Sequence, residues 1–562
     1  MLRSLVLAAA VLVAAPRATA QWSADPAVNL TIAARPAGQV QPKIVESLNG
    51  SYYVSWLGGG ADGYDVYLQR LDYGGVPQWI QGGVRVADRG YTSTQDYGLD
   101  VNESGTAFVA FRMEMGGTSQ VGLSRVERNG SVTWEARIVS SDPDGANSPR
   151  VAAVRGGGAV VAWTSGNGAL RLQRVDAAGT PEWGPEGVTI VPPSGTFFLG
   201  GLHADLDGNV IVSGQAQLSF ASRQLWMQKL STTGTPLWGS APLAVFDGTT
   251  GALQFGYFPD FTPDGAGGAF VAWYAVSGVS GSQAYVQHVL GDGTLAFGPN
   301  GVAVATDASR VRFSPSLAYN ALPPSALYVA WPEESASPPR RFGVSVQQIS
   351  ETGARLWGEF GQQVVPLGTE QTSQVRADPL WIGTLVAWAE GAAPSPMTLY
   401  AQGFVSANGP MWDPLAFKTA PTSVSRLHSS AGAYEVLQVA FAWSDGEPGT
   451  VKGQTVTWNG TLTNPGPTPS VAAGPDAQAT LAVAPHPVVG ATTIRVTLVQ
   501  PAAVRLEVLD ALGRRVAVLA NAAFGAGDHA LPWDATGLAP GVYLAQLSVG
   551  DATTARRVVV AR

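Results

Sequence analysis

The sequence predicts an all-β fold, and three features lead to that prediction. The 562-residue chain is rich in Gly (68) and Pro (39), and only 13% of its residues are charged, a balance that many short strands joined by turns would give. A strand-and-turn pattern recurs about every 55 residues along most of the chain. Residues 481–562 carry a different set of short alternating strands. We therefore expect a large β-repeat followed by a small separate β-domain.

The first residues have the three parts of a secretory signal peptide in the right order. Arg3 supplies a positive charge, Leu5–Ala15 is an apolar run too short to span a bilayer, and Ala18–Ala20 is a small-x-small cleavage site. Cleavage there would leave Gln21 as the first mature residue. The alternative is an ordinary buried N-terminal helix. We expect residues 1–20 to be removed during export.

Composition excludes several classes of function. The net charge is −8 and no block of Lys or Arg occurs, which argues against nucleic acid and anionic membrane as partners. No stretch after the signal is long and apolar enough for a transmembrane helix. The absence of Cys excludes disulfides, thiolate metal sites and a Cys nucleophile. An exported chain without disulfides needs a large core of its own, which a β-repeat array can supply.

The repeat has an apolar second strand, a third strand that carries Gln, a Gly turn and a Val/Ile fourth strand after an aromatic residue. Seven second strands end in an aromatic residue, at Trp56, Phe111, Trp163, Trp273, Trp331, Trp388 and Trp443. The remaining copy, Val210–Ser213, lacks one. This number of copies suits a β-propeller, and we predict eight blades.

The hairpin between third and fourth strands has a fixed register. A Gln or Ser is followed about ten residues later by an aromatic residue, with a turn residue between them. The pairs are Gln69 and Trp79, Ser124 and Trp134, Gln173 and Trp183, Gln228 and Trp238, Gln287 and Phe297, Gln347 and Trp357, and Gln402 and Trp412. Their turn residues are Gly75, Gly130, Gly179, Gly234, Gly293, Gly353 and Asn408. We interpret these aromatic residues, together with Trp22, as structural packing between neighbouring sheets and not as a ligand site.

The last copy lacks its fourth strand, and the mature N-terminus carries one. After Gly460 the expected aromatic position is Asn464, and a Pro/Gly-rich linker at 465–480 follows. Trp22 followed by Val28–Ile32 has the spacing of a fourth strand. We predict that this segment completes the last blade, so that both termini close the ring. The alternative is seven blades, with the atypical last unit outside the ring.

The C-terminal segment predicts a compact antiparallel β-sandwich. Its expected strands are Thr493–Leu498, Val504–Leu509, Arg515–Leu519, Gly541–Leu547 and Arg557–Val560. The predicted domains are thus a signal peptide at 1–20, a propeller at 21–464, a linker at 465–480 and a sandwich at 481–562.

Motifs in this last segment resemble a known family. They are a turn at Pro485–Pro487, a hairpin with Asp510, Gly513 and Arg514, and a Leu-x-x-Gly-Val-Tyr run ending in Gly541, Val542 and Tyr543. In combination they resemble the C-terminal sorting domain of the type IX (Por) secretion system, and Gly527–Asp534 is similar to the Ig-like domain of flagellar hook-capping proteins. His486 and Arg556-Arg557 depart from the usual Asn and Lys. The resemblance implies a bacterial protein secreted or held at the outer cell surface, with the secretion machinery as a partner of an Ig-like domain.

No catalytic or metal motif stands out. Asp205–Asn209 resembles part of a calcium loop but lacks the full run of ligands, so a turn is favoured. His203 and His428 stand on opposite blades, and we interpret them as structural or solvated. No nucleophile elbow, zinc motif or phosphate loop occurs. We expect no catalytic residue, no metal site and no cofactor.

A weaker signal comes from aromatic residues on the connections between blades, which lie on one face of a propeller. They are Tyr91, Tyr97, Phe197, Phe198, Phe255, Tyr257, Phe258 and Phe313, with Arg312 beside the last. Such residues suit stacking against sugar rings or peptide surfaces, and these are our ligand-face candidates. The alternative is that they fill space between blades.

Two functions of different class follow. The favoured hypothesis is a non-enzymatic binding or display module for extracellular glycan or protein. The alternative is a secreted polysaccharide-degrading hydrolase or lyase, which needs two carboxylates or a base converging on a pocket. The candidate carboxylates are scattered over different blades, namely Asp62, Asp65, Asp96, Glu333, Glu334, Glu390 and Asp445. Two of them meeting in a deep pocket on the loop face would favour the enzyme.

Overall fold

The structure is a computed structural model of the chain. It describes residues 21–47, 50–60, 62–89, 94, 97–205, 207–219, 221–259, 261–277, 281–321, 325–380, 383–391, 396–405, 409–431, 438–462, 479–484, 488, 490–498, 500–509, 515–538, 541–549 and 552–560. The predicted signal peptide lies outside these residues. Within them, no helix has the length and apolar character that crossing a membrane requires.

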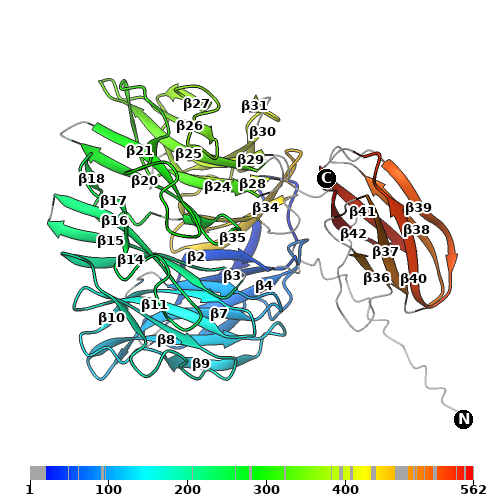
Figure 1. Cartoon of the computed structure of the whole chain (residues 1–562), viewed down its shortest axis with the longest axis horizontal. Helices are drawn as coiled ribbons and strands as arrows, with labels where there is room; N and C mark the ends of the chain where they lie inside the picture. Colours follow the sequence, from blue (N-terminus) through cyan, green and yellow to red (C-terminus); the bar gives the residue numbers. More distant parts are fainter. Residues whose placement is uncertain are drawn as a thin grey trace, which may run out of the picture.

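The described residues between Leu30 and Thr457 form eight antiparallel sheets, numbered here in chain order (Figure 1). Sheet 1 holds β2 (Gln39–Glu46), β3 (Tyr52–Gly59), β4 (Tyr64–Leu71) and β5 (Val84–Ala87); sheet 2 holds β6 (Gly98–Val101), β7 (Ala107–Met115), β8 (Thr118–Val126) and β9 (Val132–Ile138); sheet 3 holds β10 (Ala146–Ala153), β11 (Ala159–Ser165), β12 (Leu170–Val175) and β13 (Val188–Ile190); sheet 4 holds β14 (Thr196–Ala204), β15 (Val210–Ser219), β16 (Ser222–Leu230) and β17 (Leu243–Phe246).

The first strand is interrupted in two of the remaining sheets. Sheet 5 holds β18 (Ala252–Leu253), β19 (Phe261–Pro263), β20 (Ala269–Ser277), β21 (Gly281–Val289) and β22 (Val302–Ala303); sheet 6 holds β23 (Arg310–Arg312), β24 (Ser316–Asn320), β25 (Ala326–Ser335), β26 (Phe342–Ile349) and β27 (Gln362–Gly368); sheet 7 holds β28 (Thr372–Leu380), β29 (Gly383–Glu390), β30 (Thr398–Val405), β31 (Gly409–Pro410) and β32 (Leu415–Lys418); sheet 8 holds β33 (Val424–Ala431), β34 (Gln438–Asp445), β35 (Thr450–Thr457) and β1 (Leu30–Ala33).

The first strands of successive sheets contact one another in a closed cycle. The order of contact is β2, β6, β10, β14, β19, β24, β28, β33 and β2 again. Each second strand is therefore covered by other sheets on both faces, and in β11 every residue is buried. This explains why second strands are continuous apolar runs and not alternating ones. The all-β arrangement is propeller-like.

The N-terminal strand belongs to the last sheet. β1 pairs antiparallel with β35, with Leu30 opposite Gly453. The Gln454 amide donates to the Ser23 carbonyl at 3.0 Å, one residue after Trp22. In sheet 1 the Gln69 amide donates to the Ile80 carbonyl at 2.8 Å, one residue after Trp79. The chain start thus occupies the place that a fourth strand occupies elsewhere.

The aromatic residue of each hairpin packs on the hairpin of the next sheet. Gly75 has φ +83°, and a Cβ on it would lie 2.7 Å from the Trp22 ring, so only Gly allows this approach. The same close contact recurs between Trp79 and Gly130, Trp134 and Gly179, Trp183 and Gly234, Trp238 and Gly293, Phe297 and Gly353, and Trp412 and Gly460. Several indoles also donate to the next hairpin, as Trp22 Nε1 does to the Tyr73 carbonyl at 2.9 Å. These contacts join the outer parts of neighbouring sheets.

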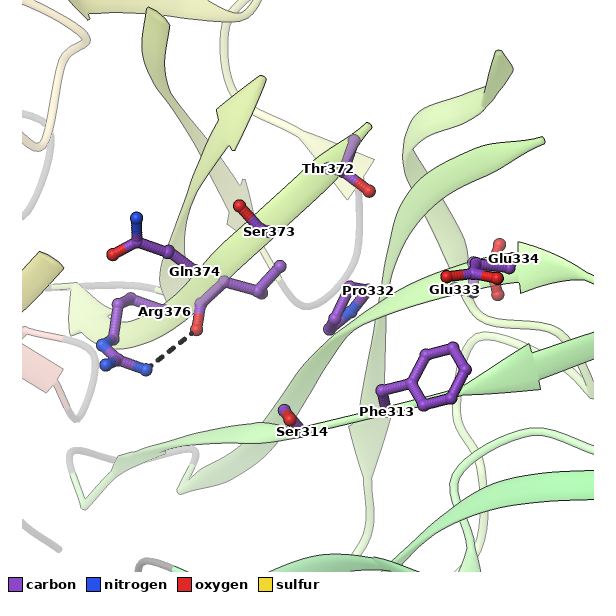
Figure 2. Close-up of a pocket in the computed structure, with 10 residues that line it drawn as sticks. Phe313, Ser314, Pro332, Glu333, Glu334, Thr372, Ser373, Gln374 and Arg376 are labelled. Atoms are coloured by element: carbon purple, nitrogen blue, oxygen red, sulfur yellow. Dashed lines mark hydrogen bonds between the residues drawn. The ribbon is translucent and has the colours of Figure 1, made fainter. Parts of the chain in front are cut away.

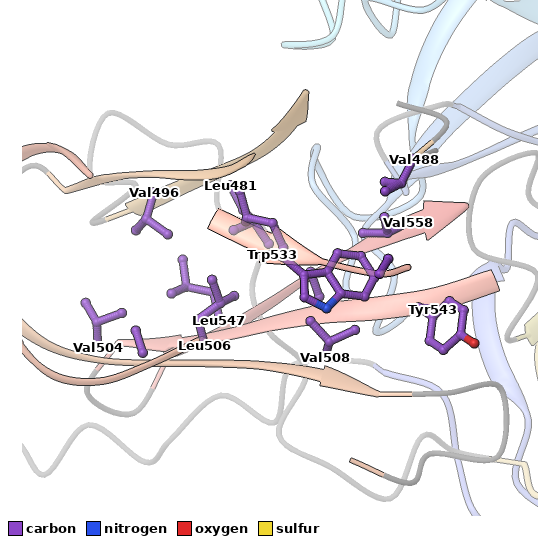
Figure 3. Packing of buried hydrophobic residues seen from close by; sticks show 14 of the residues in the cluster. Leu481, Val488, Val496, Val504, Leu506, Val508, Trp533, Tyr543, Leu547 and Val558 are labelled. Atoms are coloured by element: carbon purple, nitrogen blue, oxygen red, sulfur yellow. The ribbon is translucent and has the colours of Figure 1, made fainter. Parts of the chain in front are cut away.

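The C-terminal residues form two further antiparallel sheets around their own core (Figure 3). One holds β36 (Ala479–Ala484), β37 (Ala491–Leu498) and β40 (Gly527–Asp534); the other holds β39 (Arg515–Phe524), β38 (Ala502–Leu509), β41 (Gly541–Val549) and β42 (Ala552–Val560). Trp533 packs among Val496, Leu506 and Tyr543 in this core. The strand prediction omitted β36 and β40, and β36 begins before the predicted domain start at Leu481.

Candidate functional site

A cavity of about 320 Å³ opens between sheets 6 and 7 (Figure 2). Sheet 6 lines it with Phe313 and Ser314, which follow β23, and with Pro332–Glu334 of β25. Sheet 7 lines it with Thr372–Arg376 at the start of β28. The volume is at the lower end of the range for small-molecule sites. We call this cavity the 6/7 pocket.

The lining of the 6/7 pocket combines one aromatic ring with many polar groups. Hydroxyls come from Ser314, Thr372 and Ser373, and Glu334 and Arg376 add charged groups. The Thr372 hydroxyl donates to the Gly343 carbonyl at 3.0 Å, which leaves its oxygen able to accept. The lining therefore offers hydrogen-bond donors and acceptors beside one aromatic face.

One carboxylate of the pocket is held in a dense network. Glu333 is 2% exposed and accepts from the Trp331 indole at 3.1 Å and from the Ser345 hydroxyl at 2.9 Å. It also forms an ion pair with Arg310. Arg312 lies 3.9 Å away, and burial lowers the pKa of its guanidinium while Glu333 and Asp307 oppose that shift. Because its oxygens are already occupied, Glu333 is poorly placed to exchange a proton with a substrate.

The network of Glu333 has counterparts in other sheets. The Trp388 indole donates to Glu390 at 3.0 Å, and the Trp443 indole donates to Asp445 at 3.2 Å. In each case the carboxylate stands two residues after the second-strand Trp. Three of the carboxylates considered as catalytic candidates therefore share one structural role, the hydrogen bonding of a buried indole. In the sequence, an acidic residue two positions after the second-strand Trp is the signal that indicates this structural role.

Two of the seven candidates, Glu333 and Glu334, both line the 6/7 pocket, and the other described candidates lie elsewhere. Glu334 lines the 6/7 pocket and pairs with Arg340. Asp65 pairs with Arg85 in sheet 1, at 3.4 Å, and Asp62 is exposed in the β3–β4 connection. Asp96 lies outside the described residues.

Small residues stand on the first strand of sheet 6 where the next sheet carries long ones, and the Ser316 hydroxyl accepts from the Ala377 backbone N–H at 3.0 Å. In sheet 6, Ser316 lies opposite Ala330, which is the residue before Trp331. In sheet 7, Arg376 lies opposite Ala387, which is the residue before Trp388. Ser314 and Ser316 thus occupy the positions of Gln374 and Arg376 one sheet earlier. Ser314 and Gln374 also share a positive φ, +33° and +53°, at a bulge in the first strand.

The ligand-face candidates have different surroundings. Tyr97, Phe197 and Arg312 are buried, Phe198, Tyr257 and Phe313 are partly buried, Phe255 and Phe258 are exposed, and Tyr91 lies outside the described residues. Of this set, only Phe313 lines the 6/7 pocket. The segment Thr372–Gln374 was missed, because nothing in a single sequence links it to a loop four strands earlier in the neighbouring sheet.

The motifs considered for metal binding have other partners. Asp205 accepts from the Asn209 amide at 2.9 Å and pairs with Lys229 at 3.0 Å, as a charged turn does. His203 packs edge-on against Phe261, with ring centroids 4.8 Å apart. In the described part of the chain, no group of three or more His, Asp or Glu side chains could hold a metal ion.

Family comparison assigns the C-terminal segment. Residues 482–561 match the secretion system C-terminal sorting domain. They are a type IX sorting domain. This sorting domain marks the protein for secretion or for the cell surface. Among its motif residues Tyr543 packs in the core, whereas Asp510, Gly513 and Arg514 lie outside the described residues.

No curated protein matches the chain in sequence. Among solved structures it is similar to a polysaccharide lyase, an ulvan lyase bound to a saccharide, with a TM-score of 0.41 and 12% identity over 70% of this chain and 95% of that one. It is also similar to an α-L-arabinanase from Penicillium chrysogenum, with a TM-score of 0.35 and 11% identity over 66% of this chain and 94% of that one. A Hadza microbial sialidase gives a TM-score of 0.35 and 12% identity over 73% of this chain and 77% of that one.

Proposed function

We propose that this protein is an exported eight-bladed β-propeller that binds an extracellular glycan in the 6/7 pocket without cleaving it. In this proposal residues 1–20 are a signal peptide, residues 21–464 form the propeller, 465–480 is the linker, and the Ig-like sandwich at 481–562 directs export. The sheets are the blades, and the pairing of β1 with β35 closes the ring. The closed cycle of first-strand contacts supports eight blades over seven.

The observation that favours binding over catalysis is that the Glu333 carboxylate is buried and already has hydrogen-bond and ion-pair partners. Glycoside hydrolysis needs two carboxyl groups that can exchange protons or attack the sugar. Glu333 is buried and bound to an indole, a hydroxyl and a guanidinium, and Glu334 pairs with Arg340. The pocket keeps hydroxyls and an aromatic ring for recognition, which favours a glycan over a protein ligand.

The proposal is tested by filling the pocket. Ser373→Trp on β28 places a large ring in the cavity and should lower the affinity for glycan by at least about tenfold, since the ligand then competes with the new side chain. The measurement is binding of the full chain to an array of neutral, uronic-acid and sulfated polysaccharides, followed by titration against the best one.

A matched control is available one sheet further on. Ser425 on β33 precedes its bulge as Ser373 does, and it does not line the pocket. Ser425→Trp should therefore leave binding unchanged. Equal binding by both variants, or glycan cleavage by the wild-type chain, would contradict the proposal, and cleavage would favour the hydrolase or lyase alternative.

A further inference from the structure

We infer that the ligand is a linear glycan chain, because aromatic packing through the buried Tyr274 links the 6/7 pocket to a loop of sheet 5 that carries exposed aromatic rings. This inference rests on the proposed function and specifies its substrate class. The track is defined as Phe255, Tyr257 and Phe258 of sheet 5, Tyr274 of β20 and Phe313 of the pocket.

Three members of the track, Phe313, Tyr274 and Tyr257, touch in sequence from the pocket outward. The rings of Phe313 and Tyr274 meet edge to face, with centroids 6.0 Å apart. Tyr274 then packs on Tyr257, with centroids 4.5 Å apart. Burial raises the pKa of Tyr274, and a hydrogen bond to Ser314 of the pocket opposes that shift. The contacts therefore connect the pocket lining to the first-strand loop of sheet 5.

That loop stands at the same level as the pocket. In sheet 6, residues 313–315 interrupt the first strand. The strand ends at Arg312, which pairs with Glu333, and resumes at Ser316, which pairs with Ala330. In sheet 5, the longer segment 254–259 interrupts it at the corresponding place, after β18 and before β19. The loop of sheet 5 thus brings its aromatic residues to the end of the sheets where the pocket opens.

The outer end of the track is exposed to solvent. Phe255 is 61% exposed and Phe258 is 40% exposed. The Arg223 guanidinium lies 5.3 Å from the centroid of the Phe255 ring and also donates to the Leu253 carbonyl at 3.1 Å, so the ring stands on a fixed support. Exposed aromatic rings on a supported loop suit the apolar faces of sugars.

The size of the pocket decides between a short and a long ligand. A cavity of about 320 Å³ holds a ligand of one or two sugar rings, and such a ligand in contact with β28 cannot also cover a loop of sheet 5. Only a chain of several sugars would contact both. A short ligand would leave the exposed Phe rings without a role.

The test compares chain lengths. A disaccharide and an octasaccharide, prepared from xylan as a neutral glycan and from polygalacturonate as an acidic one, are titrated against the full chain. The octasaccharide should bind about tenfold or more tightly than the disaccharide, and the double variant Phe255→Ala/Phe258→Ala should remove that gain while leaving disaccharide binding unchanged. Both residues are exposed, so the variant should fold, and its thermal unfolding verifies this.

Phe360→Ala is the matched control. Phe360 is 57% exposed, but it lies in the β26–β27 connection, at the opposite end of β26 from the pocket. It should leave the length dependence unchanged. Equal affinity for short and long chains, or full length dependence in the double variant, would contradict glycan binding along the track. Neither result would contradict glycan binding in the 6/7 pocket. Absence of binding to any saccharide would overturn the proposed function, and this inference with it.

Discussion

The boundary between sheets 6 and 7 and the boundary between sheets 7 and 8 are built from the same positions with different side chains. At the second boundary the Gln374 amide donates to the Val424 carbonyl at 3.1 Å and accepts from the Leu427 amide at 2.6 Å. Arg376 adds a bond to the Leu427 carbonyl at 3.1 Å. At the first boundary Ser314 and Ser316 stand in their places, and a cavity remains.

This difference shows how a repeated scaffold acquires a site. Ser314 and Gln374 share a positive φ, although the first strand is interrupted in sheet 6 and continuous in sheet 7. A long amide at the bulge reaches the next sheet, as Gln41 also does to the Thr94 carbonyl at 2.6 Å. A Ser at the bulge cannot reach it. The 6/7 pocket therefore lies at a boundary that no long amide spans, although a Ser at the bulge also occurs in sheet 3, at Ser148.

The largest expected effect concerns a third boundary, between sheets 8 and 1, where the first and last strands of the eight-sheet array meet. Deletion of Trp22–Ile32 should abolish cooperative folding, because sheet 8 then loses β1 and sheet 1 loses the Trp22 contact at Gly75. Circular dichroism during thermal and urea unfolding would measure this. Val28→Ala is a control within the same segment, since Val28 is 61% exposed. A deleted chain that melts like the wild type would show that the boundary between sheets 8 and 1 closes without the N-terminal strand.

The comparison predicts that one substitution converts the open boundary into a closed one. Ser314→Gln should let the amide reach across to β28 and lower glycan affinity by about a hundredfold, with thermal stability retained. Isothermal titration with the best array ligand would measure it. The reciprocal variant Gln374→Ser should destabilise the fold by about 1–3 kcal/mol, because it leaves backbone groups near Leu427 without partners. Undiminished binding by Ser314→Gln would show that the size of this residue does not define the pocket.

A smaller expected effect is that the free energy of unfolding depends on pH through a residue of sheet 7 that has no titratable counterpart in sheet 6. Asp378 on β28 is buried, and burial raises the pKa of its carboxyl from 3.8 to about 6; the equivalent residue in sheet 6 is Ala318. Because the folded state holds the proton more tightly, the cost of the buried charge is absent below pH 3.8 and is complete above about pH 6. Asp378→Asn should therefore raise the free energy of unfolding on the order of 2 kcal/mol more at pH 8 than at pH 3.5.

An aspartate with the opposite shift serves as the control for this titration. A hydrogen bond from the Thr294 backbone lowers the pKa of Asp292, so its stabilising contribution is present above the ordinary pKa and is lost in acid. Asp292→Asn should reduce stability at neutral pH and lose that effect as the pH falls. A stability difference between Asp378→Asn and the wild type that does not change with pH would contradict the assignment.

Regular spacing made the packing residues predictable. Gly75 and its counterparts take positive φ, as the hairpin register required, and their contacts with Trp22, Trp79 and the other aromatic residues join successive sheets. The pairing of β1 with β35 follows the same register. The sorting domain was predictable because its motifs are local runs of sequence.

The sequence by itself determined the all-β class, the sheet register and the export domain, because strand alternation, turn glycines and short motifs are local properties of the chain. The tertiary structure alone decided where the pocket lies. The 6/7 pocket depends on Ser314 lying beside Thr372 across two sheets, and on Glu333 being enclosed by Trp331 and Ser345. Packing between sheets sets both. The effect of a residue that departs from the repeat therefore depends on which residues the neighbouring sheet places against it.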